Sequence, residues 1–152
     1  MKPVRVLGHS IHPMVTDFPM ALWMTSILWD FVRLWRNDQL WSAMAFWTLL
    51  LGIVAAIPAA LSGFLEYVSI PVGHKAGKKA VWHMVIMLFG GCFFTVSLIV
   101  RRVPDLLTGA QMWLALALSV AGALFVFIGG WFGGELMAHF GLGTEFFKES
   151  DQ

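Results

Sequence analysis

The sequence predicts an all-α integral membrane protein, folded as an up-and-down bundle of four transmembrane helices in a single domain over residues 1–152. Two observations lead to this fold class. Hydrophobic residues make up 59% of the chain and charged residues only 12%, roughly half the charged share of an ordinary soluble domain. In addition, three stretches carry no charged residue over about 20 residues or more, the length that a helix needs to cross the hydrocarbon core of a bilayer.

The same composition excludes several classes of protein. A water-soluble fold of this size cannot bury so much apolar surface, which excludes a nucleic-acid-binding domain, a disordered chain and a typical cytosolic enzyme. The net charge of +1 implies no strongly charged partner. The single cysteine, Cys92, excludes an intramolecular disulfide and any paired-cysteine motif for a metal or a c-type haem.

The first predicted helix covers about residues 15–35 and is the least apolar of the four. It lacks the small-residue cleavage site of a signal peptide, so we expect the helix to be retained. Asp17 precedes Phe18 and Pro19, a pattern that is typical of a helix N-cap.

Asp30 lies near the other end of this helix. We expect it to form a structural ion pair with a nearby arginine, for which the candidates are Arg33, Arg101 and Arg102.

The other three predicted helices cover about residues 42–66, 81–100 and 111–138. Short connections before the second and fourth of them make consecutive helices antiparallel neighbours. Alanine pairs in the second helix and glycine pairs in the fourth, ending at Gly133 and Gly134, are typical of close helix packing in lipid. No internal repeat is apparent in the sequence.

An even number of spans places both termini and the loop after the second helix on one membrane face. Lysine and arginine are slightly more frequent on this face than on the other, and the positive-inside rule therefore predicts cytoplasmic termini. The six basic residues of the terminal face are Lys2, Arg5, Lys75, Lys78, Lys79 and Lys148. The four on the opposite face are Arg33, Arg36, Arg101 and Arg102.

All five histidines fall on the terminal face, together with several carboxylates, and this one-sided distribution is the main functional signal. Helix bundles build metal and cofactor sites from inward-facing side chains of this kind. The candidate ligands are His12, His83, His139, Glu135, Glu66 and Asp17. We expect these six to approach one another, and we expect the remaining histidines, His9 and His74, to be solvated.

His83 is the first choice for a ligand because it sits most firmly in an apolar segment, with His12 or His139 as its partner. Glu135 and His139 share a helix face at a spacing of four residues, which suits two ligands of one ion or a carboxylate that orients a histidine. Each of these histidines could equally make a structural hydrogen bond. Glu66 could pair with a lysine of the following loop.

The chain contains the segment Ile11-His12-Pro13-Met14-Val15-Thr16-Asp17-Phe18-Pro19-Met20-Ala21-Leu22. This segment resembles the opening motif H-P-x-x-x-H-F-P-I-A-L of a prokaryotic membrane family, domain of unknown function 2231. The similarity continues in order through four further segments and covers nearly the whole chain. These segments are Trp29-Asp30, Ile57-Pro58 to Glu66-Tyr67, Trp82-His83, and Gly133-Gly134-Glu135-Leu136 with His139-Phe140-Gly141.

Two positions depart from the motifs of that family. Its second motif histidine is Asp17 here, and an aspartate of its second motif is Glu66 here. If that histidine binds a cofactor in relatives, this chain either uses a carboxylate or lacks the ligand. Relatives fused to cytochrome c or Rieske-type domains imply redox partners at a membrane, although a shared fold alone does not imply a shared function.

The sequence therefore favours a small membrane redox protein that binds one b-type haem, or alternatively a Zn or Fe ion, at the face that carries the termini. Its electrons would pass to or from a quinone or a partner cytochrome, and we expect no substrate chemistry on this chain alone. The alternative is a cofactor-free accessory subunit of an oligomer or a larger membrane complex. A proton or small-solute pathway is a third reading, which the scarcity of charges at mid-membrane disfavours.

Overall fold

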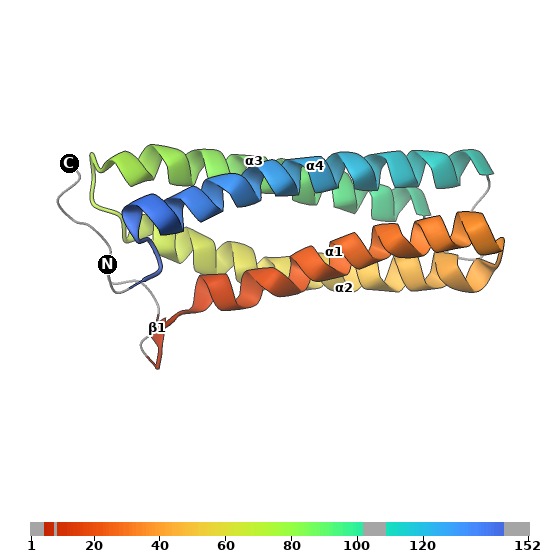
Figure 1. Cartoon of the computed structure of the whole chain (residues 1–152), viewed down its shortest axis with the longest axis horizontal. Helices are drawn as coiled ribbons and strands as arrows, with labels where there is room; N and C mark the ends of the chain where they lie inside the picture. Colours follow the sequence, from red (N-terminus) through yellow and green to blue (C-terminus); the bar gives the residue numbers. More distant parts are fainter. Residues whose placement is uncertain (1–4, 8, 102–108, 145–152) are drawn as a thin grey trace.

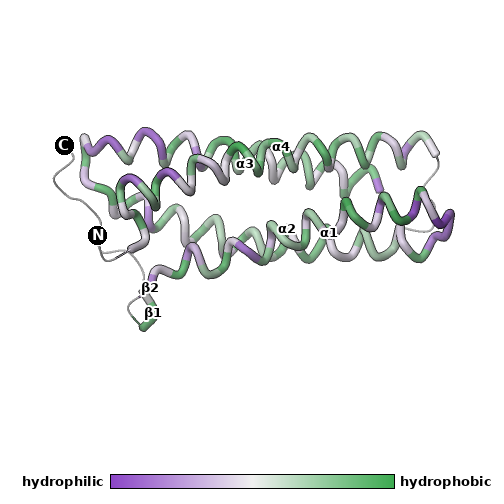
Figure 2. Tube along the Cα trace, in the orientation of Figure 1, coloured by the Kyte–Doolittle hydropathy of each residue, from purple (hydrophilic) through white to green (hydrophobic). Residues whose placement is uncertain are grey.

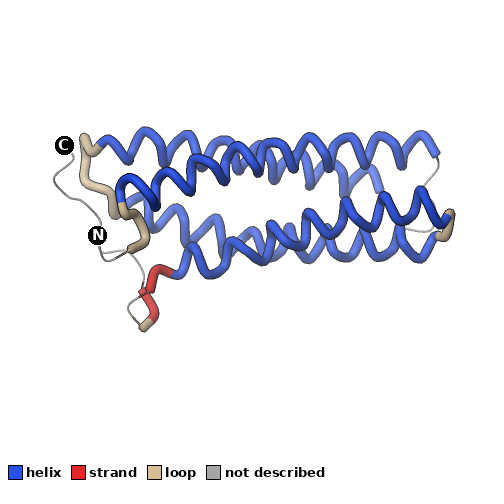
Figure 3. The backbone as a smooth tube through the Cα atoms, viewed as in Figure 1, coloured by secondary structure: helices blue, strands red, loops and turns tan. Residues whose placement is uncertain are grey.

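The computed structural model describes residues 5–7, 9–101 and 109–144. Within them, four long helices run alongside one another: α1 (Ile11–Arg36), α2 (Gln39–Val68), α3 (Lys75–Arg101) and α4 (Gly109–Phe140). Two antiparallel strands of two residues each, β1 (Arg5–Val6) and β2 (His9–Ser10), precede α1. The helices alternate in direction, so that α1 and α3 begin, and α2 and α4 end, at one end of the bundle (Figures 1 and 3).

The predicted all-helical class is confirmed, and each helix is longer than the apolar stretch that predicted it. Helix α1 begins at Ile11 with Ser10 as its N-cap, so the interpretation of Asp17 as a cap was wrong. Helix α3 begins at Lys75, which places His83 well inside the helix. Lysine is a good helix former, so a helix that leaves the apolar region can continue through a basic segment.

Three of the helices in the described part of the chain, α2, α3 and α4, are long and apolar enough to cross a membrane, and α1 does not meet the same criterion of hydropathy. The hydrophilic residues gather toward the two ends of the bundle (Figure 2). Many large apolar side chains are exposed along the helices, among them Leu61, Leu88 and Phe127, each more than 60% exposed. Such a surface is suited to lipid rather than water.

The helices pack most extensively within two hairpins, α1 with α2 and α3 with α4. A tight turn joins α1 to α2: Asn37 has a left-handed backbone with φ of 51°, and the Asp38 side chain accepts a hydrogen bond from the Leu40 amide. Between the hairpins, the core contains Trp23, Leu49 and Phe94, and the Trp23 and Phe94 rings stack with centroids 4.7 Å apart.

A buried ion pair joins α1 to α3 near the end of the bundle where both helices finish. Asp30 and Arg101 are each 2% exposed, and the guanidinium donates to both carboxylate oxygens, at 2.6 and 2.5 Å. This identifies the arginine partner of Asp30 among the three candidates, because Arg33 instead donates to Ser42 and Asn37. Of the basic residues used to predict orientation, Lys2, Arg102 and Lys148 lie outside the described residues.

Candidate histidine site between α1 and α3

The site forms where His12 of α1 and His83 of α3 meet across the bundle. Their ring centroids are 6.3 Å apart and the ring planes are nearly perpendicular, at 84°. His12 lies in the first turn of α1 and His83 lies in the third turn of α3. Both helices begin at the same end of the bundle, so the two rings reach the same depth from opposite hairpins.

Each ring is fixed by a hydrogen bond within its own hairpin. The Nδ1 atom of His12 lies 3.0 Å from the carbonyl oxygen of Ala59 in α2, and Nδ1 of His83 lies 2.7 Å from the carbonyl oxygen of Gly129 in α4. A carbonyl can only accept, so Nδ1 must carry the proton in both rings. In the neutral ring, Nε2 then keeps its lone pair. This is the arrangement in which a backbone carbonyl orients a histidine that binds a metal through its other nitrogen.

Two glycines leave room for the rings. A Cβ atom on Gly63 would lie 2.7 Å from Cε1 of His12, and a Cβ atom on Gly133 would lie 3.1 Å from Cε1 of His83. Neither position could carry a side chain without displacing a ring or a helix. Gly133, which the sequence marked as a packing position, and Gly63, which it did not, therefore both determine where the imidazoles can lie.

The other four predicted ligands lie in different surroundings. Glu66 is buried and accepts a hydrogen bond of 2.9 Å from the Ser10 hydroxyl. Glu135 pairs with Lys79, and the exposed ring of His139 lies 4.0 Å from the same carboxylate oxygen. Asp17 is exposed on α1. Within the described residues, no three histidine, cysteine or acidic side chains come together in a group that could hold a metal ion.

His74 was predicted to be solvated, and this prediction was wrong. It is 4% exposed, its Nδ1 atom accepts a hydrogen bond from the Ala76 amide at the start of α3, and its ring packs against Phe140 of α4. No sequence signal marked this role, because the predicted third helix begins at about residue 81, whereas α3 begins directly after His74, where a side-chain acceptor can bind a free amide of the first turn. His9, in contrast, is exposed as expected.

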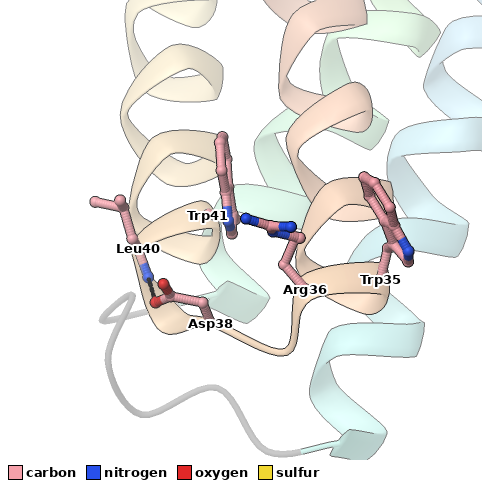
Figure 4. A pocket seen from close by; sticks show the side chains of 5 residues that line it. All are labelled: Trp35, Arg36, Asp38, Leu40 and Trp41. Carbon is pink, nitrogen blue, oxygen red and sulfur yellow. Dashed lines mark hydrogen bonds between the residues drawn. The ribbon is translucent and has the colours of Figure 1, made fainter.

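His12 and His83 line neither of two cavities in the described part of the bundle. An apolar cavity of about 310 Å³ lies between α1 and α4, and the residues that line it include Met20, Met24 and Trp131. A second cavity of about 470 Å³ lies at the turn from α1 to α2 (Figure 4). There the Arg36 side chain extends between Trp41 and Trp35 (Figure 4), and its guanidinium carbon lies 5.5 Å from the Trp35 ring centroid. Tryptophan and arginine at a helix end are typical of a membrane–water interface.

Comparison with known protein families identifies residues 8–145 as matching the predicted membrane proteins called DUF2231. The chain belongs to this family. The resemblance inferred from the motifs is thus confirmed over nearly the whole chain, and with it the assignment as a membrane protein. No curated protein and no solved structure matches this DUF2231 chain.

Proposed function

We propose that this DUF2231 protein is a small redox protein of a prokaryotic inner membrane that holds one b-type haem between His12 and His83. The observation that supports the proposal is the pair of facing imidazoles, each fixed through Nδ1 to a carbonyl of its own hairpin. Electrons would pass to or from a membrane quinone or a partner cytochrome.

The number of ligands favours haem iron over a zinc or iron ion held only by side chains. A haem iron takes one or two axial ligands from the protein, whereas a structural zinc takes four protein ligands and a catalytic zinc three. The described residues offer two imidazoles together and no group of three ligand-capable side chains. Glu66 and Glu135 have other partners, Ser10 and Lys79, so we assign the ligand role to the histidines alone.

The separation of the two rings also fits a single metal between them. Metal–nitrogen bonds to imidazole are about 2.0–2.1 Å long for zinc, and similar bonds to one metal would place two opposed nitrogens about 4 Å apart. The rest of the 6.3 Å between the ring centroids is the distance from each centroid to the nitrogen that would bind the metal, counted once for each ring. Because Nδ1 of each ring is occupied, Nε2 is the atom of each ring that would face the metal.

When bound, the haem would supply a reversible one-electron couple, whose potential depends on its axial ligands and surroundings. The protein would contribute three things. The carbonyls of Ala59 and Gly129 hold the imidazoles in one tautomer and one orientation. Gly63 and Gly133 leave room for the two rings, and the apolar helices around the pair keep it partly buried.

We further propose that α1 is a fourth membrane span and that both termini face the cytoplasm. Helix α1 contains 26 residues, a length of about 39 Å at the usual rise, and its buried carboxylate Asp30 is neutralised by Arg101. Reporter fusions at the C-terminus and in the connection between α3 and α4 should give opposite signals. Equal signals would contradict an even number of spans, and exchanged signals would reverse the orientation only.

The deciding experiment is the visible spectrum of the detergent-purified protein, oxidised and reduced with dithionite, with haem and metal content per chain. We expect one haem per wild-type chain. His12→Ala and His83→Ala should each lose it. His139→Ala is the matched control, since it removes an exposed histidine from the same end of the bundle, and it should keep the haem.

A wild-type protein with neither haem nor stoichiometric metal would overturn the redox proposal. It would leave the accessory-subunit alternative, in which the imidazole pair serves only as a contact between hairpins. Loss of haem from His139→Ala, but not from His12→Ala, would show that the wrong partner had been assigned to His83.

A further inference from the structure

The side chains that join α1 to α3 occupy equivalent positions in the two helices. Arg101 lies 71 residues after its partner Asp30, and the same offset relates the two residues of every other contact named here between these helices. The contacts, ordered from the end where α1 and α3 begin, are His12–His83, Trp23–Phe94 and Asp30–Arg101. Helices α1 and α3 thus present the same face to each other at the same depth.

The hydrogen bonds that fix the histidines are equivalent as well. The carbonyl acceptor lies 47 residues after His12 and 46 residues after His83, in the next helix of the same hairpin in both cases. In both hairpins, the glycine that faces the ring comes one helical turn after that acceptor. Each hairpin therefore contains the same three parts: a histidine, its acceptor carbonyl and a facing glycine.

The central aromatic pair repeats this pattern. A Cβ atom on Gly52 of α2 would lie 2.6 Å from the Trp23 ring, and a Cβ atom on Gly122 of α4 would lie 3.0 Å from the Phe94 ring. Ser26 of α1 and Ser97 of α3, one turn beyond these aromatic residues, are both completely buried. The equivalence thus extends along the bundle from the histidines to the ion pair.

We propose that the chain consists of two equivalent helical hairpins, related by a two-fold axis between His12 and His83, which supply two equivalent half-sites to one ligand on that axis. In a two-fold assembly, residues near the axis contact their own counterparts, as the three pairs between α1 and α3 do. This relation is not apparent as a repeat in the sequence. Few residues are identical between the hairpins because positions that face lipid accept any apolar side chain, whereas the equivalence is retained at the axis.

The two-fold arrangement restricts the class of ligand, and this step depends on the proposed function. A ligand on the axis meets two identical imidazoles from opposite hairpins, so it must offer two equivalent positions on opposite sides. A planar iron tetrapyrrole offers two such axial positions. A tetrahedral ion would leave two of its positions without protein ligands, because the described residues add no third side chain to the pair.

One pair breaks the symmetry in a way that makes the hairpins complementary. At the equivalent positions 30 and 101, one hairpin carries a carboxylate and the other a guanidinium, and both are buried. Two copies of the first hairpin would bring two carboxylates together, and two copies of the second would bring two guanidiniums together. A buried charge without a partner is strongly destabilising, so this pair favours the association of unlike hairpins over like ones.

Exchange of equivalent residues in the full chain tests the two-fold relation. Asp30→Arg and Arg101→Asp alone should each lower the melting temperature and the yield of monodisperse protein, and the double exchange should recover part of the loss. Arg101 also contacts the Ser119 hydroxyl at 3.3 Å, and the residue equivalent to Ser119 in the first hairpin is Leu49. Adding Leu49→Ser and Ser119→Leu to the double exchange should therefore bring the melting temperature close to the wild-type value.

A quadruple exchange that is no more stable than the single variants would overturn the equivalence of the two hairpins. The milder exchange Trp23→Phe with Phe94→Trp gives a second test in case the charge variants fail to fold. Each single change should lower the melting temperature, and the double variant should lower it by less than the sum of the two single losses. A loss equal to or greater than that sum would contradict the two-fold relation.

The proposal that two equivalent half-sites bind one ligand is tested separately, by the haem content and spectra of His12→Ala and His83→Ala. Two equivalent half-sites predict that both variants lose haem to the same extent and show the same change in spectrum, within about two-fold in occupancy. A clear difference between the variants would overturn the equivalence of the half-sites. A wild-type protein without haem would overturn the proposed function and the ligand class, whereas the exchange experiments would still decide on the two-fold relation.

Discussion

The two polar bridges between α1 and α3 differ in what they leave available for chemistry. At one end of the bundle, both oxygens of Asp30 accept from Arg101, and Ser97 and Ser119 lie close to the guanidinium. At the other end, His12 and His83 each use one ring nitrogen, and within the described residues neither Nε2 atom has a hydrogen-bond partner. The ion pair is satisfied by the protein itself, whereas the histidine pair retains two lone pairs for a ligand.

The largest expected effect comes from breaking the ion pair. Arg101→Gln leaves Asp30 as a buried, unpaired carboxylate, and removal of one partner from such a pair costs about 3–5 kcal/mol. The free energy of unfolding in detergent micelles would measure this. Arg36→Gln is the control because Arg36 is exposed at the same end of the bundle. A loss below about 1 kcal/mol for Arg101→Gln would mean that the pair is far more hydrated than its burial indicates.

A smaller effect is expected from Gly52→Ala at the centre of the bundle. Its Cβ atom would lie 2.6 Å from the rigid and buried Trp23 ring, and overpacking of this kind costs about 1–3 kcal/mol. Gly91→Ala makes a matched control, since its nearest contact is a Trp23 atom at 4.0 Å. The same unfolding experiment should show a loss for the first variant and little change or a gain for the second.

Gly63→Ala tests whether haem binding at the histidine end depends on the position of the His12 ring. The added methyl group would displace the His12 ring, so we expect bound haem to fall while stability changes by only about 1 kcal/mol, because alanine is the better helix former. Gly134→Ala, with open space around the new Cβ atom, should leave the haem content unchanged. Full haem occupancy in Gly63→Ala would count against His12 as a ligand.

The smallest effect is expected at the surface pair Lys79–Glu135. Both side chains are partly exposed, at 35% and 25%, and exposed pairs contribute only about 0–1 kcal/mol. Lys79→Ala should therefore change the unfolding free energy by less than Arg101→Gln does. High salt screens an exposed pair, so the effect of Lys79→Ala should become smaller still as salt is added. A loss as large as that of Arg101→Gln would show that this end of the bundle depends on the pair.

Much of the fold could be predicted from the sequence because apolar length is a local property. Uncharged stretches located the last three helices, and the short turn at Asn37 and Asp38 made the first two antiparallel neighbours. The boundaries were less predictable. Helix α1 begins at Ile11 rather than near residue 15 because its hydrogen bonds do not depend on hydropathy, and α3 includes the basic residues from Lys75 onward for the same reason.

For the candidate site, the depth of each polar residue could be predicted from the sequence, since antiparallel helices place all five histidines at one end. It could not determine the direction in which each side chain points around its helix. That direction depends on packing between helices, which turns His12 and His83 toward each other, pairs Glu135 with Lys79 and buries Glu66 against Ser10. The proposed equivalence of the two hairpins likewise became visible from the packing of the helices, because contacts across the axis constrain a few positions and lipid leaves the others free.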